Sequence, residues 1–418
     1  MRRSHRFLPL ALVVATATAL LVAPAAEARP VAAPAAQLAK GTVIDRTLFG
    51  MQVANAEYGQ WPTVPVGSFR LWDNQTSWAQ IEKSQGNFDW TNLDNAVATA
   101  QAHGVKDILM VLAGTPAWAT DDPSPTALPI AGAAGMPRDF GWWDNWVAQV
   151  ATRYKGKITA YQPWNEANLS TFSNGSPAEM ADLTKRAHDI IKGIDPSATI
   201  VAPSTGTRLV GAFRKFYPAF LQELKARNWP VDVWTAHTYP AWNQTPVNRA
   251  ILAKMWQAEL SKAGAPKLPM WDTENNFGLW GPGKTPDPDI EGAKAANWVA
   301  RSYLDALRLG VSRVYWYRWE TFNDRWGIQM YTGTPGAQAY ATLQDWIVGS
   351  AFQGCKSSGT KVTCTFTKSG SPFSIVYTDS GKVKTFATGA AKQVCSLGGS
   401  CAPISGTKVR TSGPVLLK

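Results

Sequence analysis

Two glutamates end short apolar segments of this chain and lie 108 positions apart (274 − 166). Glu166 ends the segment Ile158–Glu166, which reads ITAYQPWNE, and Glu274 ends Leu268–Glu274, which reads LPMWDTE. Both segments are typical of buried strands, so each carboxyl group comes where a predicted strand gives way to a loop. Two carboxyl groups that meet in one pocket can deliver a proton and a nucleophile or base to one acetal bond, as cleavage of a glycosidic linkage requires.

Each glutamate also has a simpler interpretation. Glu166 follows Asn165, and an acidic residue in this position can favour the start of a helix without any chemical role. Glu274 can be a solvated carboxylate at a strand end, and Asp272 is then the candidate to replace it as nucleophile. The choice depends on whether the fold brings the two strand ends together.

Short apolar segments alternate with longer amphipathic ones from about residue 47 to about residue 349. Between the predicted strands apolar residues recur with helical spacing, for example at Val299, Tyr303 and Leu307. The eight predicted strands are Leu48–Val53, Ser68–Trp72, Asp107–Ala113, Ile158–Trp164, Thr199–Ala202, Val231–Thr238, Leu268–Glu274 and Ser312–Trp319.

Eight strand–helix units predict an α/β chain with a closed (β/α)8 TIM barrel, which we assign to residues 41–349. A doubly wound open sheet is the alternative. Such a sheet normally has a glycine-rich phosphate turn after its first strand, and the segment Ala54–Tyr58 is not one.

The chain changes character after the barrel, where short segments rich in Thr and Val alternate with Ser and Gly turns. This pattern predicts a small C-terminal antiparallel β domain over residues 350–418. All the cysteines lie in it, namely Cys355, Cys364, Cys395 and Cys401. A clustered, even set predicts disulfides in an exported protein, and of the three pairings we favour Cys355–Cys364 with Cys395–Cys401, because each closes a short loop. A zinc site is the disfavoured rival, since C-x-x-C pairs and nearby histidines are missing from this sequence.

The first 28 residues have the features of a secretory signal peptide. Three arginines precede an apolar run, and the triplet Ala26–Ala28 offers a cleavage site. The run is short and diluted with Ala and Thr, so we expect cleavage and no stable membrane span. Residues 29–40, rich in Ala and Pro, are predicted to form a disordered lead-in. The expected location is therefore outside the cell or in its wall.

The chain is basic, with a formal net charge of +11 at neutral pH. Loss of the signal removes three Arg and one Glu, which leaves +9. The basic residues are scattered and form no nucleic-acid motif, so nucleic acid is not an expected partner. Diffuse positive charge is typical of a solvated surface, and it can also favour an acidic wall polymer.

Active-site residues of a (β/α)8 barrel gather at the C-terminal ends of its strands. The candidates at these positions are Arg70, Trp118, Asn165, Glu166, His237, Tyr239, Glu274, Trp316 and Trp319. Two of them have structural alternatives: Arg70 can pair with Asp73 or Glu82, and His237 can be a neutral histidine of the core.

These strand ends resemble those of a known group. The segments YQPWNE, ending at Glu166, and WDTE, ending at Glu274, are similar to retaining glycoside hydrolases of the clan A superfamily. Trp78–Asp94, Thr115–Trp118 and the His237-x-Tyr239 pair are similar to members around glycoside hydrolase family 39. The resemblance covers roughly residues 45–350, and such enzymes often carry an accessory β-sandwich. Their substrates range from xylosides and glycosaminoglycan units to exopolysaccharide chains.

The resemblance implies that Glu166 is the general acid/base and Glu274 the nucleophile. Glu166 must then hold a proton at working pH, whereas Glu274 must stay ionised. Arg70 and Tyr239 are placed to stabilise the ionised nucleophile, and Asn165 to bind the 2-hydroxyl of the sugar. No metal or organic cofactor is expected.

Tryptophan is unusually frequent, with 20 residues in the chain. Indole rings stack on the apolar faces of sugars, so Trp118 and either Trp316 or Trp319 are expected to line substrate subsites. Long aromatic loops favour endo action on a chain over removal of one terminal unit.

The leading hypothesis is a secreted, monomeric retaining β-glycoside hydrolase that acts on a polysaccharide or cell-wall glycan. A catalytically inactive barrel that binds glycan is the alternative from another class. A transglycosidase is a third possibility, because it would use the same two glutamates and the same covalent intermediate.

Overall fold

The computed structural model describes residues 37–124, 130–279, 290–320 and 327–418, which all belong to one compact unit. The predicted signal peptide, residues 1–28, lies outside the described residues. Among the described helices, none is both long and apolar enough to cross a membrane.

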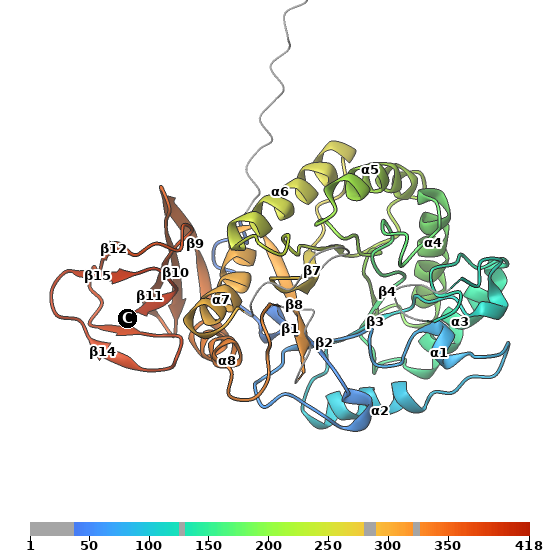
Figure 1. Ribbon diagram of the computed structural model, residues 1–418, viewed down its shortest axis with the longest axis horizontal. Coiled ribbons are helices and arrows are strands. Elements are labelled where there is room, and N and C mark those ends of the chain that lie inside the picture. Colours follow the sequence, from blue (N-terminus) through green and yellow to red (C-terminus); the bar gives the residue numbers. More distant parts are fainter. Residues whose placement is uncertain (1–36, 125–129, 280–289, 321–326) are drawn as a thin grey trace, which may run out of the picture. The chain divides into compact units, whose positions relative to one another are not determined.

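Eight parallel strands form one curled sheet, with helices around its outside (Figure 1). The strands are β1 Phe49–Val53, β2 Ser68–Leu71, β3 Ile108–Val111, β4 Ala160–Gln162, β5 Thr199–Ile200, β6 Trp234–His237, β7 Met270–Asn275 and β8 Val311–Trp319. Their order is β5-β4-β3-β2-β1-β8-β7-β6, and the isolated parallel bridges Val201–Val233 and Gly206–His237 join the β5 edge to β6. The predicted (β/α)8 fold is confirmed, and each predicted strand overlaps an observed one.

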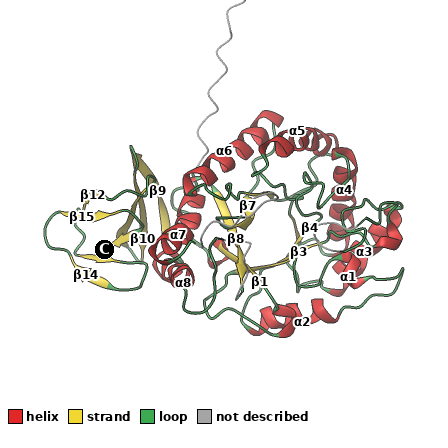
Figure 2. Cartoon of the chain, in the orientation of Figure 1, coloured by secondary structure: helices red, strands yellow, loops and turns green. Residues whose placement is uncertain are grey.

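Helices alternate with the strands along the chain, as the cartoon in Figure 2 shows. They are α1 Trp78–Ile81, α2 Thr91–Ala102, α3 Phe140–Arg153, α4 Pro177–Ile194, α5 Val210–Ala226, α6 Pro246–Ala263, α7 Gly292–Arg308 and α8 Pro335–Ile347. Helix α4 begins at a complete N-terminal capping motif. Ser176 caps it, Glu179 bonds back to the cap, and Pro177 fills the first helical position, where a missing N–H costs nothing.

The inside of the barrel is filled by stacked side chains. One layer is apolar and contains Leu109, Ala160, Val201, Val233, Trp271 and Tyr315. Further along the strands, toward their C-terminal ends, the inward positions become polar, as at Arg70 and Gln162. The polar groups are therefore concentrated at the end of the barrel where active sites of this fold are found.

The C-terminal strands form antiparallel sheets, as predicted. Strands β9 Ala351–Ser358, β10 Lys361–Lys368, β11 Ser371–Thr378, β13 Gln393–Cys395, β14 Cys401–Pro403 and β16 Val415–Leu417 belong to one sheet, and β12 Lys384–Ala387 pairs with β15 Lys408–Thr411. The disulfides are Cys355–Cys364, which joins β9 to β10, and Cys395–Cys401, which joins β13 to β14. The predicted local pairing is confirmed.

The predicted disordered lead-in over residues 29–40 is wrong for its last part. The side-chain amide of Gln37 donates to the Cys355 carbonyl oxygen at 2.8 Å and accepts from the Cys355 N–H at 2.7 Å. The Leu38 N–H donates to the Leu307 carbonyl oxygen at 3.0 Å. Composition alone did not indicate this order, because the partners of Gln37 and Leu38 lie more than 250 residues away in the sequence.

Candidate active site

Arg70 on β2 ties three other side chains together inside the barrel. Its Nη1 donates to Glu274 Oε1 at 2.6 Å, and its Nη2 donates to Asn165 Oδ1 at 2.7 Å. Nη2 and Nε also donate to Gln162 Oε1, at 2.8 and 3.1 Å. Arg70 has no exposed surface, and a buried guanidinium is tolerated only when such partners replace water. The network therefore fixes the ends of β4 and β7 relative to β2.

The two alternative partners of Arg70 are engaged elsewhere. Asp73 accepts from Arg318 Nη1 at 3.1 Å. Glu82 accepts from the Trp78 indole N–H at 2.6 Å. The structure thus places the Arg70 guanidinium against the predicted nucleophile and not in a peripheral ion pair.

Glu274 on β7 accepts hydrogen bonds at both carboxylate oxygens. Tyr239 donates from its hydroxyl to Glu274 Oε2 at 3.0 Å, while Arg70 occupies Oε1. Glu274 is 6% exposed, and this burial raises the pKa of its carboxyl group, while His237 and Arg70 act to lower that pKa. Charge-assisted and hydroxyl bonds to the carboxylate favour its ionised form.

Glu166 stands just after β4 in a left-handed backbone conformation, with φ of 42°. Its N–H donates to Ser204 Oγ at 2.9 Å. Asn168 and Gly206 exchange two hydrogen bonds, at 3.0 and 2.8 Å, between the same two loops. A Cβ on Gly206 would lie 2.8 Å from Glu166 Oε1, so glycine leaves room for this carboxyl group. The loop after β5 therefore sets the position of Glu166.

Burial raises the pKa of Glu166 to about 7, and Arg208 and Arg70 oppose the shift. The described residues give this carboxyl group only one hydrogen-bond partner, His237, in contrast to the two donors on Glu274. Two neighbouring carboxyl groups do not both ionise easily. One of the two groups therefore keeps a proton. Glu274 accepts from two donors and Glu166 from one, so we assign that proton to Glu166.

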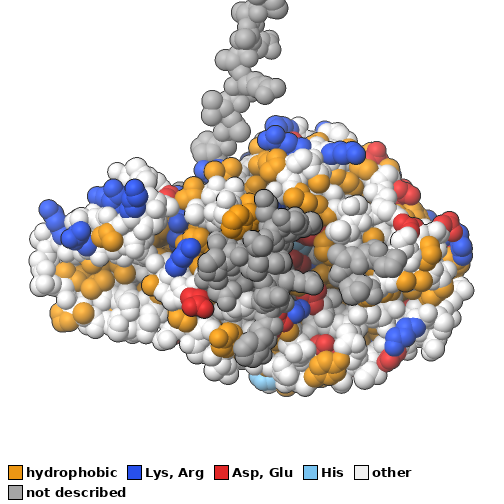
Figure 3. Space-filling model, in the orientation of Figure 1, with side chains coloured by type: hydrophobic (Ala, Val, Ile, Leu, Met, Phe, Trp, Pro, Cys, Tyr) orange, Lys and Arg blue, Asp and Glu red, His pale blue; other side chains and the backbone are white. Residues whose placement is uncertain are grey.

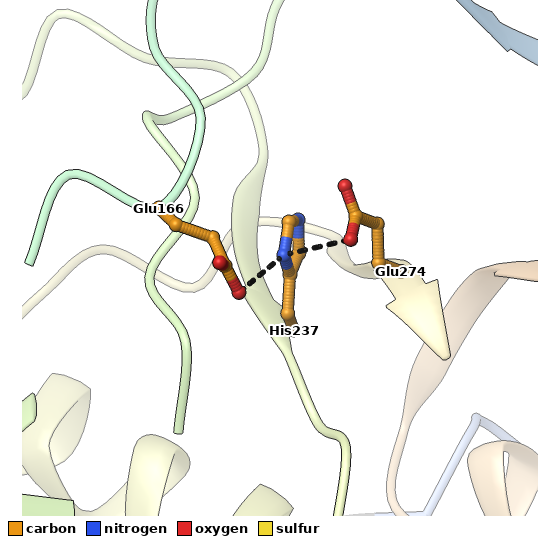
Figure 4. Close-up of side chains that lie close together, drawn as sticks. All are labelled: Glu166, His237 and Glu274. Atoms are coloured by element: carbon orange, nitrogen blue, oxygen red, sulfur yellow. Dashed lines mark hydrogen bonds and ion pairs between the residues drawn. The ribbon is translucent and has the colours of Figure 1, made fainter. Parts of the chain in front are cut away.

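His237 on β6 lies between the two glutamates, as Figure 4 shows. Its Nδ1 is 3.0 Å from Glu166 Oε1 and 3.4 Å from Glu274 Oε2. Burial lowers the pKa of His237 to about 4, so the ring is neutral above that pH. Because Nδ1 faces two carboxyl groups, we assign the single ring proton to Nδ1. Nε2 is then an acceptor, and it is buried without a hydrogen-bond partner among the described residues.

The distance between the two glutamates fits one type of chemistry. The carboxylate oxygens of Glu166 and Glu274 that face His237 lie within 4.8 Å of each other. Retaining glycosidases hold their carboxyl groups about 5–5.5 Å apart, whereas inverting ones leave about 6.5–9.5 Å for a water molecule. The short separation matches the retaining arrangement.

The same three side chains offer ligand atoms of the kind that divalent cations prefer. However, the hydrogen bonds around His237 already give these atoms a role. With its proton on Nδ1, the ring presents no lone pair there to a metal ion. The arrangement therefore fits proton and covalent chemistry by the carboxyl groups better than metal binding.

Asp272, the alternative nucleophile, is wholly buried and engaged in other contacts. Arg249 on α6 donates to its Oδ2 from Nη2 at 2.7 Å. Thr238, which follows His237, donates to Asp272 from its backbone N–H at 3.2 Å and also from its hydroxyl. Asp272 therefore supports the end of β6, and Glu274 alone of the two faces Glu166.

Of the three tryptophans predicted to line substrate subsites, two are buried and Trp118 is partly exposed. Trp316 has no exposed surface and Trp319 is 8% exposed, so both rings are largely covered. Trp118 contacts Trp78 and Trp142 edge-on, and its indole N–H donates to the Glu82 carbonyl oxygen at 2.9 Å. The stacking of sugar on these rings stays a prediction.

A cavity of about 470 Å³ opens elsewhere, at the N-terminal ends of the strands. Its walls include Thr199 at the start of β5, Pro269 just before β7 and Ser312 near the start of β8. None of the residues around Glu166 and Glu274 lines it. In this fold the N-terminal face is associated with stability, so the cavity is separate from the chemistry.

The structure thus brings together Arg70, Asn165, Glu166, His237, Tyr239 and Glu274. Gln162 was not among the predicted site residues, although it lies on the predicted fourth strand at the period-2 spacing that makes it point inward. Ser204 and Gly206 were not predicted either, because only the closure of the barrel brings their loop to Glu166.

Comparisons with known proteins agree with the fold described above. The family model described as Beta-galactosidase, glycoside hydrolase family 42, matches residues 69–163. No curated protein sequence matches the chain. A family 39 glycoside hydrolase from Bacteroides cellulosilyticus WH2 has a similar structure, with TM-score 0.67 and 18% identity over 90% of this chain and 82% of that one.

Two further structures are similar over most of their length. A monomeric β-xylosidase from Caulobacter crescentus CB15 has TM-score 0.60 and 15% identity, covering 91% of this chain and 97% of that one. A GH30 endoxylanase from Clostridium papyrosolvens C71 has TM-score 0.54 and 15% identity, covering 92% and 97%. The resemblance to (β/α)8 glycoside hydrolases is therefore confirmed in fold, while activity must be argued from the site.

Proposed function

We propose that this chain is a retaining β-glycoside hydrolase that works by double displacement. The observation that carries the proposal is the glutamate pair Glu166 and Glu274, in which one carboxyl oxygen of each lies within 4.8 Å of the other and the two groups have unequal partners. Arg70 and Tyr239 hold Glu274 as a carboxylate, whereas burial raises the pKa of Glu166 to about 7 and keeps it protonated. This is the division of labour that glycoside cleavage needs.

In the first step a carboxylate oxygen of Glu274 attacks the anomeric carbon. The bond from that carbon to the leaving oxygen breaks, and the leaving oxygen takes the proton of Glu166. In the second step the Glu166 carboxylate removes a proton from water, whose oxygen attacks the anomeric carbon and displaces Glu274. Both residues thus return to their starting protonation states.

His237 and Asn165 support both steps. Neutral His237 donates from Nδ1 toward the facing carboxylate oxygens, which keeps the two groups close without adding a positive charge to the pair. Asn165 Oδ1 accepts from Arg70, so its amide N–H group is left to bind a sugar hydroxyl. A bond of this kind to the 2-hydroxyl strengthens in the oxocarbenium-like transition state.

The substrate is a neutral or acidic glycan outside the cell, and the protein acts after removal of its signal peptide. Similar structures include β-xylosidases and an endoxylanase, which makes β-xylosides and xylans the first substrates to test. Basic side chains on the face shown in Figure 3 are scattered singly or in small groups among other residues, which supports a glycan over a nucleic acid. Endo action is also part of the proposal; it rests on the aromatic loops of the sequence, and product size tests it.

The direct test is a screen of the purified protein against aryl β-glycosides, polysaccharides and wall glycans, with product size as the readout. Glu274→Ala is the matched control, and it should bind the same glycans without turnover. Large products indicate endo action, and transfer of glycosyl units to added sugar indicates a transglycosidase. Binding without turnover by the unmodified protein would instead identify an inactive glycan-binding barrel.

A further inference from the structure

Gln52 on β1 is a buried amide without a hydrogen-bond partner among the described residues. The residue is 2% exposed, yet both Nε2 and Oε1 have no hydrogen bond within the part of the chain that the structure describes. Buried polar atoms in proteins nearly always have partners, because leaving them unpaired carries a full desolvation cost. An amide that lacks partners at both ends therefore needs an explanation.

The alternation along β1 shows where Gln52 points. The Phe49 ring stacks on Tyr303 of α7 at 4.5 Å, so Phe49 faces the outer helices. A Cβ on Gly50 would lie 2.6 Å from the Tyr315 ring, which belongs to the apolar layer inside the barrel. Since successive residues of a strand face opposite sides, Gln52 faces the barrel interior, as Gly50 does.

The register of the sheet places Gln52 beside Arg70. Met51 is paired with Phe69, so the next residues on the two parallel strands, Gln52 and Arg70, stand at the same level. Neighbouring strands lie about 5 Å apart. The Gln52 side chain therefore leaves its strand beside Arg70, whose guanidinium holds Glu274 and Asn165.

A second inward glutamine near this level provides a comparison. Gln162 on β4 uses its oxygen to accept from Arg70 twice and its amide nitrogen to donate to the Ala202 carbonyl oxygen at 3.1 Å. Both polar atoms of Gln162 thus have partners within the protein. Gln52 has the same side chain, but neither of its polar atoms is hydrogen-bonded to any residue that the structure describes.

Other polar atoms at this end of the barrel are also without partners. His237 Nε2 and Thr205 Oγ1 are buried and unpaired among the described residues, and both belong to the strand ends that surround Glu166. Sugar hydroxyl groups both donate and accept hydrogen bonds, so they can satisfy an amide, an imidazole nitrogen and a hydroxyl together. An ionised carboxylate ligand cannot satisfy Gln52 Oε1, because it only accepts.

We propose that Gln52 is a substrate-binding residue that contacts hydroxyl groups of the sugar unit attached to Glu274 during the reaction. Its Nε2 donates to one hydroxyl oxygen and its Oε1 accepts from the same or the adjacent hydroxyl. Gln52 therefore selects sugars that carry those hydroxyl groups. The proposal rests on the proposed glycosidase function.

The test uses Gln52→Leu, which keeps the size of the side chain and removes its polar atoms. It is compared with the unmodified protein on the 4-nitrophenyl β-glycoside that the latter hydrolyses fastest, and on the monodeoxy analogues of that glycoside. We expect kcat/KM on the parent glycoside to fall about 10- to 100-fold, roughly tenfold for each lost hydrogen bond. One or two deoxy analogues, which the unmodified protein disfavours, should be hydrolysed by the variant almost as well as the parent.

Thermal stability separates this role from a structural one. Gln52→Leu should raise Tm in the absence of ligand, because an unpaired buried amide is replaced by an apolar group. Thr235→Val is the matched control, since the Thr235 hydroxyl is buried and bonded to the Thr273 hydroxyl at 2.7 Å. This control should lower Tm and leave the discrimination against deoxy analogues intact.

The outcomes distinguish the two proposals. Hydrolysis by the unmodified protein, together with unchanged kcat/KM and unchanged discrimination in Gln52→Leu, would overturn the role of Gln52 and leave the glycosidase function standing. A lowered Tm with retained discrimination would show that the amide instead holds a structural water, and would also overturn it. An unmodified protein that hydrolyses no glycoside would overturn both.

Discussion

Replacement of Arg70 by leucine removes the charge that holds Glu274 ionised. The guanidinium and carboxylate are joined at 2.6 Å, with side-chain exposures of 0% and 8%, so solvent screens them little. Charge centres about 4 Å apart in a medium of effective dielectric about 20 attract by about 4 kcal/mol. Since each 1.36 kcal/mol is tenfold in rate, kcat/KM should fall by about a thousandfold.

The pH profile tests the reason for that loss. Without Arg70 the pKa of Glu274 rises further, and the acidic limb of kcat/KM moves to higher pH, toward the limb set by Glu166 near pH 7. The pH range in which Glu274 is ionised and Glu166 is protonated then narrows. Arg70→Lys keeps a positive charge but loses the fork that reaches Asn165 and Gln162, so it should retain more activity than Arg70→Leu.

The assay is kcat/KM on an aryl glycoside from pH 4 to pH 9, with a thermal melt of each variant to verify that it is folded. A folded Arg70→Leu variant with an unmoved acidic limb would refute the reasoning, because Arg70 would then have no electrostatic effect on the nucleophile. Equal activities of the leucine and lysine variants would refute it too.

Two other substitutions test neighbouring parts of the site. Arg208→Leu removes a charge that lowers the pKa of Glu166, so the alkaline limb of kcat/KM should move above its position near pH 7; a limb that stays or moves down would contradict this assignment. Arg249→Leu leaves Asp272 buried without its cation and should cost about 3–5 kcal/mol of unfolding free energy, measured by urea denaturation. A loss below about 1 kcal/mol would mean that the pair does not support Thr238 and the end of β6.

Much of the barrel could be predicted because its strands are short, apolar and regularly separated by amphipathic helices. Glu166 and Glu274 followed from their positions at strand ends, where parallel strands of a barrel converge. The partners of Arg70 did not follow, because Asp73 and Glu82 were nearer in sequence than Glu274. Only the closure of the sheet decided among them.

Other features depend on contacts that no local pattern encodes. Gln37 was assigned to a disordered segment by composition, yet it pairs with Cys355 across more than 300 residues. The burial of Trp316 was not predicted, because a tryptophan at a strand end can face either the helices or the mouth of the barrel. The residue type alone does not determine which side it faces. Gln52 had no motif around it, and its unpaired amide appears only when its neighbours are known.

The assignment of Glu274 as nucleophile is the central claim, and covalent trapping tests it most directly. The protein is incubated with an activated 2-fluoro glycoside of the sugar that it hydrolyses, digested, and mapped by mass spectrometry. We predict one glycosyl label per chain, on Glu274 and absent from Glu274→Ala. A label on Asp272, or steady hydrolysis with no trapped intermediate, would contradict the account.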